Sequence, residues 1–199
     1  MFYHLEGIVS EIGPNLVVLD CGGIGFALNT TVNTISYLKT GEKAKLYVAE
    51  AIGENNFDLY GFSSKSEKHC YEMLVSVSGI GPKAALSILS YNTPDGLALS
   101  ILNSDVKALM VAPGIGKKIA QRVILELKDK ISKELERPVM DMPVVNLPSV
   151  GDKQVNDAVA ALTVLGYNSS EVAQALKQID TGGMSAEQII KAVLKQMVK

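Results

Sequence analysis

The sequence is poor in several residue types, and each shortage narrows the classes of protein it can represent. Its 199 residues include no tryptophan, two cysteines and only 6% aromatic residues. Cys21 and Cys70 form no CxxC pair and have no histidine at metal-ligand spacing, so we expect reduced thiols, as in a cytoplasmic protein, and no metal. No run of 18 apolar residues occurs, and no basic segment precedes the apolar N-terminus. We therefore expect neither a membrane span nor a signal peptide.

Motifs for catalysis are also missing. The glycines of CGGIGF at residues 21–26 lack the GxxxxGK[ST] order that cradles nucleotide phosphates, and no ATP motif occurs elsewhere. His69 and Cys70 are adjacent and so cannot share a helix face as a nucleophile and its base. No carboxylate cluster indicates two-metal chemistry. We expect no catalytic residue and no cofactor in this chain.

Charge is nearly balanced overall, at −2, but it is unevenly distributed along the chain. Residues 1–62 carry 3 basic and 7 acidic side chains, residues 63–137 carry 11 and 8, and residues 138–199 carry 5 and 6. Only the middle segment is basic, and it holds both arginines, Arg122 and Arg137. An anionic partner is therefore expected at that segment.

The pattern predicts a multidomain α+β protein. Residues 1–62 contain short β-rich runs separated by turn signals, which indicates an OB-like, five-stranded β-barrel with one helical crossover at TVNTISYLKTGE. In residues 63–133 the apolar residues recur at helical spacing. This segment contains two helix-hairpin-helix units, with a further helix near residues 97–102. The proline-bearing residues 134–152 are expected to form a flexible linker, and residues 153–199 a three-helix, UBA-like bundle.

Two helix starts in this bundle carry capping-box patterns. Asn168 is followed three residues later by Glu171, and Ser185 by Gln188.

An internal repeat lies in the basic segment. A shift of 35 residues superposes GIGPK, at residues 79–83, on GIGKK, at residues 114–118, together with the apolar positions on either side. Glycine tolerates positive φ and allows another molecule to approach the backbone closely. The isoleucine between each glycine pair can anchor the turn in the core, while free amides and the next helix N-terminus face outward.

This arrangement of free amides and a helix N-terminus favours the binding of an anion. Lys83, Lys118 and Arg122 follow in the first turns of the helices, where the helix dipole prefers acidic side chains, so an external phosphate explains them better. The alternative is a glycine pair that only tightens a turn, but two lysine-bearing copies favour binding to a nucleic acid backbone. Such contacts carry no base information, so binding should be independent of sequence.

The two copies differ at one position. Pro82 stands where the second copy has Lys117, so the first hairpin offers one donor and one charge fewer. The second hairpin should therefore contribute more, and alanine at Lys118 and Arg122 should weaken binding and flatten its salt dependence.

The chain resembles the RuvA family of bacterial Holliday-junction-binding proteins. The resemblance runs over essentially the whole chain and is specific in LYGF (59–62), GIGPKAALSIL (79–89), PGIGKKIAQR (113–122) and AVAALTVLGY (158–167). It implies a homotetramer, alone or as one of a pair of tetramers, that holds four-way junction DNA open and flat. The implied phosphate-binding set is Gly79, Ile80, Gly81, Lys83, Gly114, Ile115, Gly116, Lys117, Lys118 and Arg122.

Further family features follow from the same resemblance. The family carries an acidic pin at the platform centre, which would fall here on Glu54 and Asn55; the asparagine departs from the usual second acid and would weaken the repulsion of phosphates. The C-terminal bundle would contact the RuvB ATPase hexamer, and the RuvC resolvase is a further partner to test. The apolar candidates for motor binding are Leu165, Tyr167, Leu176, Ile190 and Leu194.

Two other classes stay open on the residues alone. Helix-hairpin-helix DNA glycosylases carry a similar PGIGKK stretch with a catalytic lysine and a downstream aspartate, for which Lys118 with Asp129 or Asp141 would be the candidates. Base release dependent on Lys118 would support that class. In a protein-only adaptor the hairpins would be structural turns, and a preference for four-way junctions over linear duplex would exclude it.

Overall fold

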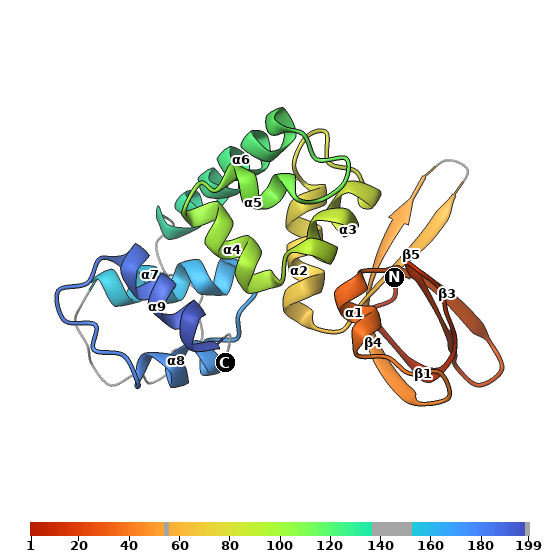
Figure 1. Ribbon diagram of the computed structural model, residues 1–199. Helices are drawn as coiled ribbons and strands as arrows, with labels where there is room; N and C mark the ends of the chain where they lie inside the picture. The colour runs from red at the N-terminus through yellow and green to blue at the C-terminus, as the bar shows by residue number, and fades with distance from the viewer. Residues whose placement is uncertain (54–55, 137–152, 198–199) are drawn as a thin grey trace.

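The computed structural model describes residues 1–53, 56–136 and 153–197. Figure 1 shows three parts in chain order: a β-barrel, a central group of helices and a C-terminal group of helices. The elements are β1 (His4–Ile12), β2 (Leu16–Asp20), β3 (Gly25–Thr30), α1 (Val32–Ser36), β4 (Lys43–Ile52), β5 (Phe57–Phe62), α2 (Lys65–Val75), α3 (Pro82–Tyr91), α4 (Pro94–Leu102), α5 (Val106–Met110), α6 (Lys117–Glu136), α7 (Lys153–Val164), α8 (Ser169–Leu176) and α9 (Ala186–Met197).

The barrel closes in the order β1-β2-β3-β5-β4, which confirms the predicted OB-like architecture. All pairs are antiparallel except β3 with β5, and the connection between β3 and β4 contains the helix α1. Alternating apolar side chains fill the interior, because successive residues of a strand point to opposite faces. The buried set is Val9, Val17, Leu19, Leu28, Leu46, Val48 and Leu59.

A buried polar joint connects the barrel to the helices. Glu67 on α2 is only 3% exposed, and its carboxylate accepts hydrogen bonds from the hydroxyls of Thr31 at 2.5 Å and Thr34 at 2.6 Å. Ser63, which directly follows β5, donates to the same carboxylate through its amide and its hydroxyl. Beside this cluster the ring of Tyr71 stacks on Tyr60 with 5.1 Å between centroids. The joint fixes how α2 leaves the barrel.

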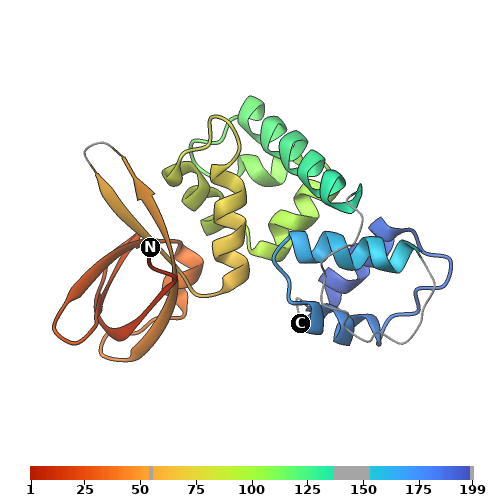
Figure 2. The ribbon, with the colours of Figure 1, turned by 180° about the vertical axis from the view of Figure 1, so that it is seen from behind.

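The helices from α2 to α9 share one continuous apolar core. Helix α7 packs on α6, and α9 contacts α4, so the C-terminal bundle lies against the central helices (Figures 1 and 2). The hydroxyl of Tyr167 donates to the carboxylate of Asp95 on α4, and Gly166 lies against the side chain of His69 on α2. Burial, and then the hydrogen bond to Asp95, raise the pKa of Tyr167 above its ordinary value.

One predicted capping box in the bundle is present at the start of α9. The amide of Ser185 donates to the side-chain oxygen of Gln188 at 2.9 Å, and the amide of Gln188 donates to the hydroxyl of Ser185 at 3.3 Å. Two otherwise unpaired amides are thereby satisfied.

Candidate nucleic-acid interface

The two glycine hairpins have the same backbone geometry. Gly79 and Gly114 adopt φ of 87° and 83°, a region that L side chains rarely enter. In each hairpin the isoleucine amide closes the turn, from Ile80 to the Val77 carbonyl at 3.0 Å and from Ile115 to the Ala112 carbonyl at 3.1 Å. Both isoleucine side chains are 5% exposed and sit in the helical core. The central isoleucines therefore anchor the turns, as the repeat predicts.

The glycine faces of both hairpins are open. A Cβ placed at Gly81, Gly114 or Gly116 would meet nothing within 4 Å, and at Gly79 it would meet only a guanidinium nitrogen of Arg122, at 3.6 Å. The amides of these four glycines have no hydrogen-bond partner among the described residues. Unpaired donors on an uncovered surface are suited to oxygen acceptors of another molecule.

Both hairpins lead directly into a helix N-terminus. Helix α3 starts at Pro82 after Gly81, which provides no side-chain cap, and α6 starts at Lys117 after Gly116. Neither helix has an acidic residue in its first turn. Neither positive dipole end is therefore neutralised by an acidic side chain in its own first turn.

Three exposed lysines stand at these helix starts. Lys83 lies on α3, and Lys117 and Lys118 lie on α6. No carboxylate of the described residues pairs with any of their ammonium groups. Uncompensated cations beside free amides give each hairpin a local positive potential, and the second hairpin, with two adjacent lysines, has the larger one.

Arg122 takes a different position from the lysines. It starts one turn further along α6, and its Nη1 donates to the Ser78 carbonyl, at the edge of the first hairpin, at 3.2 Å. Its Nε lies 3.8 Å from a carboxylate oxygen of Glu126. The residue therefore connects the helix of the second hairpin to the first hairpin.

The hairpins lie side by side at one end of the central helices. Figures 1 and 2 show the α2–α3 loop beside the α5–α6 loop from both sides. A second contact joins them, because the hydroxyl of Ser87 on α3 donates to the Pro113 carbonyl at 2.8 Å. The sequence reasoning missed Ser87, although the shift of 35 residues superposes it on Arg122.

The geometry does not assemble the residues of a glycosylase site. Lys118 and Asp129 are on the same helix, eleven residues apart, which corresponds to roughly 16 Å along the axis at about 1.5 Å per residue. Both side chains are exposed, and Asp141 lies outside the described residues. Burial, and then the nearby Asp95, raise the pKa of the Cys70 thiol to about 12, so it is no nucleophile.

Within the described residues, no group of three or more His, Cys, Asp or Glu side chains could hold a metal ion. In the same part of the chain, no helix combines the length and the apolar character needed to cross a bilayer.

Comparison with known proteins covers the chain from end to end. Residues 1–61 match the family model of the RuvA N-terminal domain, residues 71–129 that of a SAM-like helix-hairpin-helix tandem, and residues 153–198 that of the RuvA C-terminal domain. A Holliday junction branch migration complex subunit RuvA from Ruminiclostridium cellulolyticum is 40% identical over 99% of this chain and all of its own length. The chain belongs to the RuvA family.

Other members of the family are similarly close. The RuvA subunit of Alkaliphilus oremlandii is 38% identical, and that of Caldanaerobacter subterraneus subsp. tengcongensis is 40% identical. Both alignments span the full length of this chain and of the relative.

The pin that the RuvA family resemblance implies falls on Glu54 and Asn55, which lie outside the described residues. The strands on either side, β4 and β5, project together beyond the barrel alongside the helices (Figure 1). At the last described pair of these strands, the amide of Gly53 donates to the Asn56 carbonyl at 2.8 Å. The role of Glu54 and Asn55 stays a prediction.

The five apolar residues predicted to bind the motor are all buried within the chain. Leu165, Tyr167, Leu176, Ile190 and Leu194 have exposures of 1%, 8%, 9%, 3% and 0%. They pack in the core that the bundle shares with the central helices. Their contact with the motor of the RuvA family stays a prediction, and it would require a rearrangement that uncovers them.

Proposed function

We propose that the chain is the DNA-binding, non-catalytic subunit of a branch-migration complex, and that it binds four-way junctions without regard to base sequence. The named RuvA relatives, aligned over their full length, support this function. The single observation that carries it is the pair of open glycine hairpins. Within the described residues, their glycine amides have no hydrogen-bond partner and their lysines pair with no carboxylate. Main-chain donors and cations bind phosphates, and phosphate contacts are independent of base identity.

The proposed roles divide among the hairpin residues. Amides of the glycine pairs and the ammonium groups of Lys83, Lys117 and Lys118 hold phosphate oxygens, while Ile80 and Ile115 keep the turns in place. The second hairpin binds more strongly, because Lys117 adds a charge and an amide at the position where Pro82 has neither.

The proposed assembly extends beyond one chain. Residues 1–62 form the barrel. The predicted boundary at residue 134 moves, because α6 continues to Glu136, so residues 63–136 form the DNA-binding unit and 137–152 the linker. Residues 153–199 form the bundle that meets the RuvB ATPase, which supplies hydrolysis. Four chains in the cytoplasm form a platform on which the hairpins of all copies meet one junction, and an acidic pin at Glu54 and Asn55 occupies its centre. RuvC resolvase is proposed as a further partner of the same platform.

The test compares the affinity for a synthetic four-way junction and for a linear duplex across a salt series. The variant K117A/K118A should weaken junction binding and reduce the slope of log K against log salt by about 1 to 2 for each chain in contact with DNA, since each phosphate contact contributes about 0.9. Lys83→Ala should have a smaller effect than the double variant.

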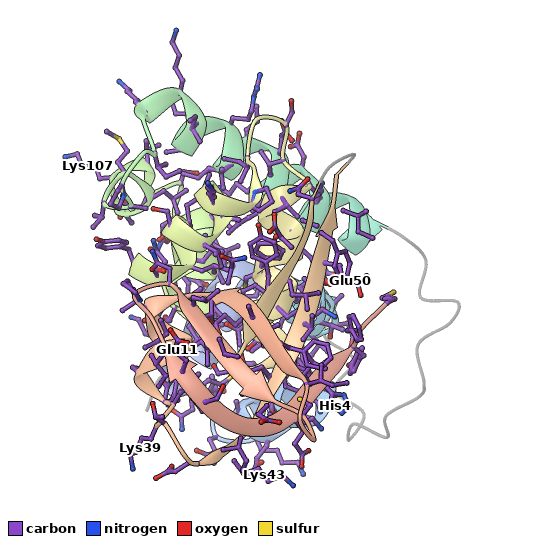
Figure 3. All side chains as sticks on the ribbon, turned by 90° about the vertical axis from the view of Figure 1, so that its right-hand side faces the viewer. His4, Glu11, Lys39, Lys43, Glu50 and Lys107 are labelled. Atoms are coloured by element: carbon purple, nitrogen blue, oxygen red, sulfur yellow. The ribbon has the colours of Figure 1, made fainter. Side chains whose placement is uncertain are left out.

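Lys39→Ala is the matched control. This lysine is exposed and lies at the lower end of the barrel in Figure 3. The central helices, marked there by Lys107, lie at the opposite end of the view. Its replacement should leave affinity and slope at the parent values. Parent affinity and slope in K117A/K118A, or equal affinity of the parent protein for junction and duplex, would refute the proposed function.

A further inference from the structure

The two hairpins are joined by a pair of contacts that repeat the internal symmetry of the sequence. The shift of 35 residues superposes Ser87 on Arg122 and Ser78 on Pro113. Ser87 donates to the carbonyl of Pro113 at 2.8 Å, and Arg122 donates to the carbonyl of Ser78 at 3.2 Å. Each accepting residue directly precedes the first glycine of its hairpin. The helix after each hairpin therefore holds the other hairpin at the equivalent atom.

Helix α6 strengthens its half of this arrangement with two further side chains. Glu126 accepts a hydrogen bond from the amide of Ser78 at 3.4 Å, so α6 binds both backbone polar groups of that residue. Lys130 donates to the hydroxyl of Ser76. Arg122, Glu126 and Lys130 are spaced by four residues and so occupy one face of α6. Residues 76–78, which lead into the first hairpin, are thus bonded to side chains along two turns of α6.

We infer that Ser87 and Arg122 form a reciprocal clamp that sets the spacing of the two hairpins, so that both engage the backbone of one duplex as a single preorganised unit. The inference deepens the proposed function and rests on it. It assigns Arg122 as a positioning residue rather than a phosphate ligand, because its guanidinium is already directed to Ser78 and Glu126. The three lysines and the free amides remain the groups that touch phosphate.

Preorganisation explains why such a clamp would affect binding. Two weak sites held at a fixed spacing bind together with a high effective concentration, and this advantage is lost when the spacing varies. Ordering a loose hairpin at the moment of binding would also subtract from the affinity. Neither effect changes the number of phosphates neutralised, so the salt slope should not depend on the clamp.

The experiment uses Ser87→Ala and Arg122→Lys in the full chain, with Ser90→Ala as the matched control. Ser90 is also on α3 and also makes one hydrogen bond, but its hydroxyl accepts from the amide of Val32 near the barrel. Arg122→Lys keeps the charge and removes the planar fork that reaches both Ser78 and Glu126.

The first measurement is amide hydrogen exchange in the free protein. Loss of one hydrogen bond should speed local opening about threefold to tenfold. Ser87→Ala should produce this change at the Ile115 amide and leave Ile80 unchanged, although Ser87 lies in the first repeat. Arg122→Lys should do the reverse. This crossed pattern tests the clamp whether or not the protein binds DNA.

The second measurement is junction affinity across a salt series. Both variants should bind about threefold to tenfold more weakly with an unchanged slope, and Ser90→Ala should match the parent protein. Parent exchange rates and parent affinity in either variant would overturn the clamp while the parent's preference for junctions still upheld the proposed function. An exchange change confined to the hairpin of the substituted repeat would also overturn it.

Discussion

The carboxylate of Glu67 offers the sharpest stability test, because it forms the polar joint between the barrel and α2. It is 3% exposed and accepts four hydrogen bonds, at 2.5 and 2.6 Å from the hydroxyls of Thr31 and Thr34, and at 3.1 and 3.2 Å from the hydroxyl and amide of Ser63. Glu67→Ala would leave these donors facing a cavity. Each hydrogen bond to a charged group is worth about 1.5–3 kcal/mol, and the four are not additive.

We therefore expect Glu67→Ala to lower the free energy of unfolding by about 3–5 kcal/mol. Glu67→Gln keeps the shape and one acceptor oxygen, so its loss should be smaller, at about 1–3 kcal/mol. Urea denaturation followed by circular dichroism gives both values. Glu72→Gln is the control, since this carboxylate is on the same helix but 50% exposed, and its pair with Lys68 should contribute less than about 1 kcal/mol.

A Glu67→Ala protein that unfolds at the same urea concentration as Glu72→Gln would refute the reasoning. The four donors would then be satisfied by water at no cost, and the buried joint would not be what orients α2 on the barrel.

Two further predictions concern the bundle contact and the thiols. Tyr167→Phe removes the hydrogen bond to Asp95 and should lower the unfolding free energy by about 1–3 kcal/mol in urea. Because the pKa of Tyr167 is raised in the folded state, the stability that this side chain contributes is complete below its ordinary pKa near 10 and declines as the pH rises further. Above that pH the parent protein should therefore lose more stability than Tyr167→Phe. Equal losses in the two proteins would contradict the raised pKa of Tyr167. For the thiols, a colorimetric reagent at pH 8 should label the half-buried Cys21 in the native protein and both cysteines in denaturant. Burial raises the pKa of Cys70 from 9.0 to about 12, which reduces its thiolate fraction about 1000-fold. Rapid labelling of both thiols in the native protein would contradict the burial of Cys70.

Local signals account for the parts of the fold that the sequence predicts well. The short β-rich runs predicted within residues 1–62 form the five strands of the barrel, because alternation and turn residues act within a few positions of one another. The capping box at Ser185 and Gln188 is predicted for the same reason. The hairpin anchors Ile80 and Ile115 follow from the repeat, which requires both copies to fold alike.

Contacts between distant residues account for what the sequence does not predict. Ser64 and Glu67 have capping-box spacing, yet the carboxylate of Glu67 is directed to threonines 33 and 36 residues away. Arg122 reaches across 44 residues to Ser78, and Tyr167 across 72 residues to Asp95. Helical periodicity identifies an apolar face but not the surface that covers it, which is why five motor-binding candidates proved to be core residues.

The two hairpins differ in rigidity and in charge, and the clamp accounts for the difference in rigidity. Pro82 removes a donor from the first hairpin, but its ring fixes φ near the helical value, so the first turn of α3 is already ordered. Three side chains of α6 hold the same hairpin, whereas in the described part of the chain one side chain of α3, Ser87, holds the second. The first hairpin is thus the more rigid and the second the more highly charged. The first hairpin is bound to α6, the helix that carries Lys117 and Lys118. Once the first hairpin contacts the duplex, it therefore places these two lysines next to the same duplex. Loosening α6 at Arg122 should therefore reduce binding by the second hairpin as well as the first.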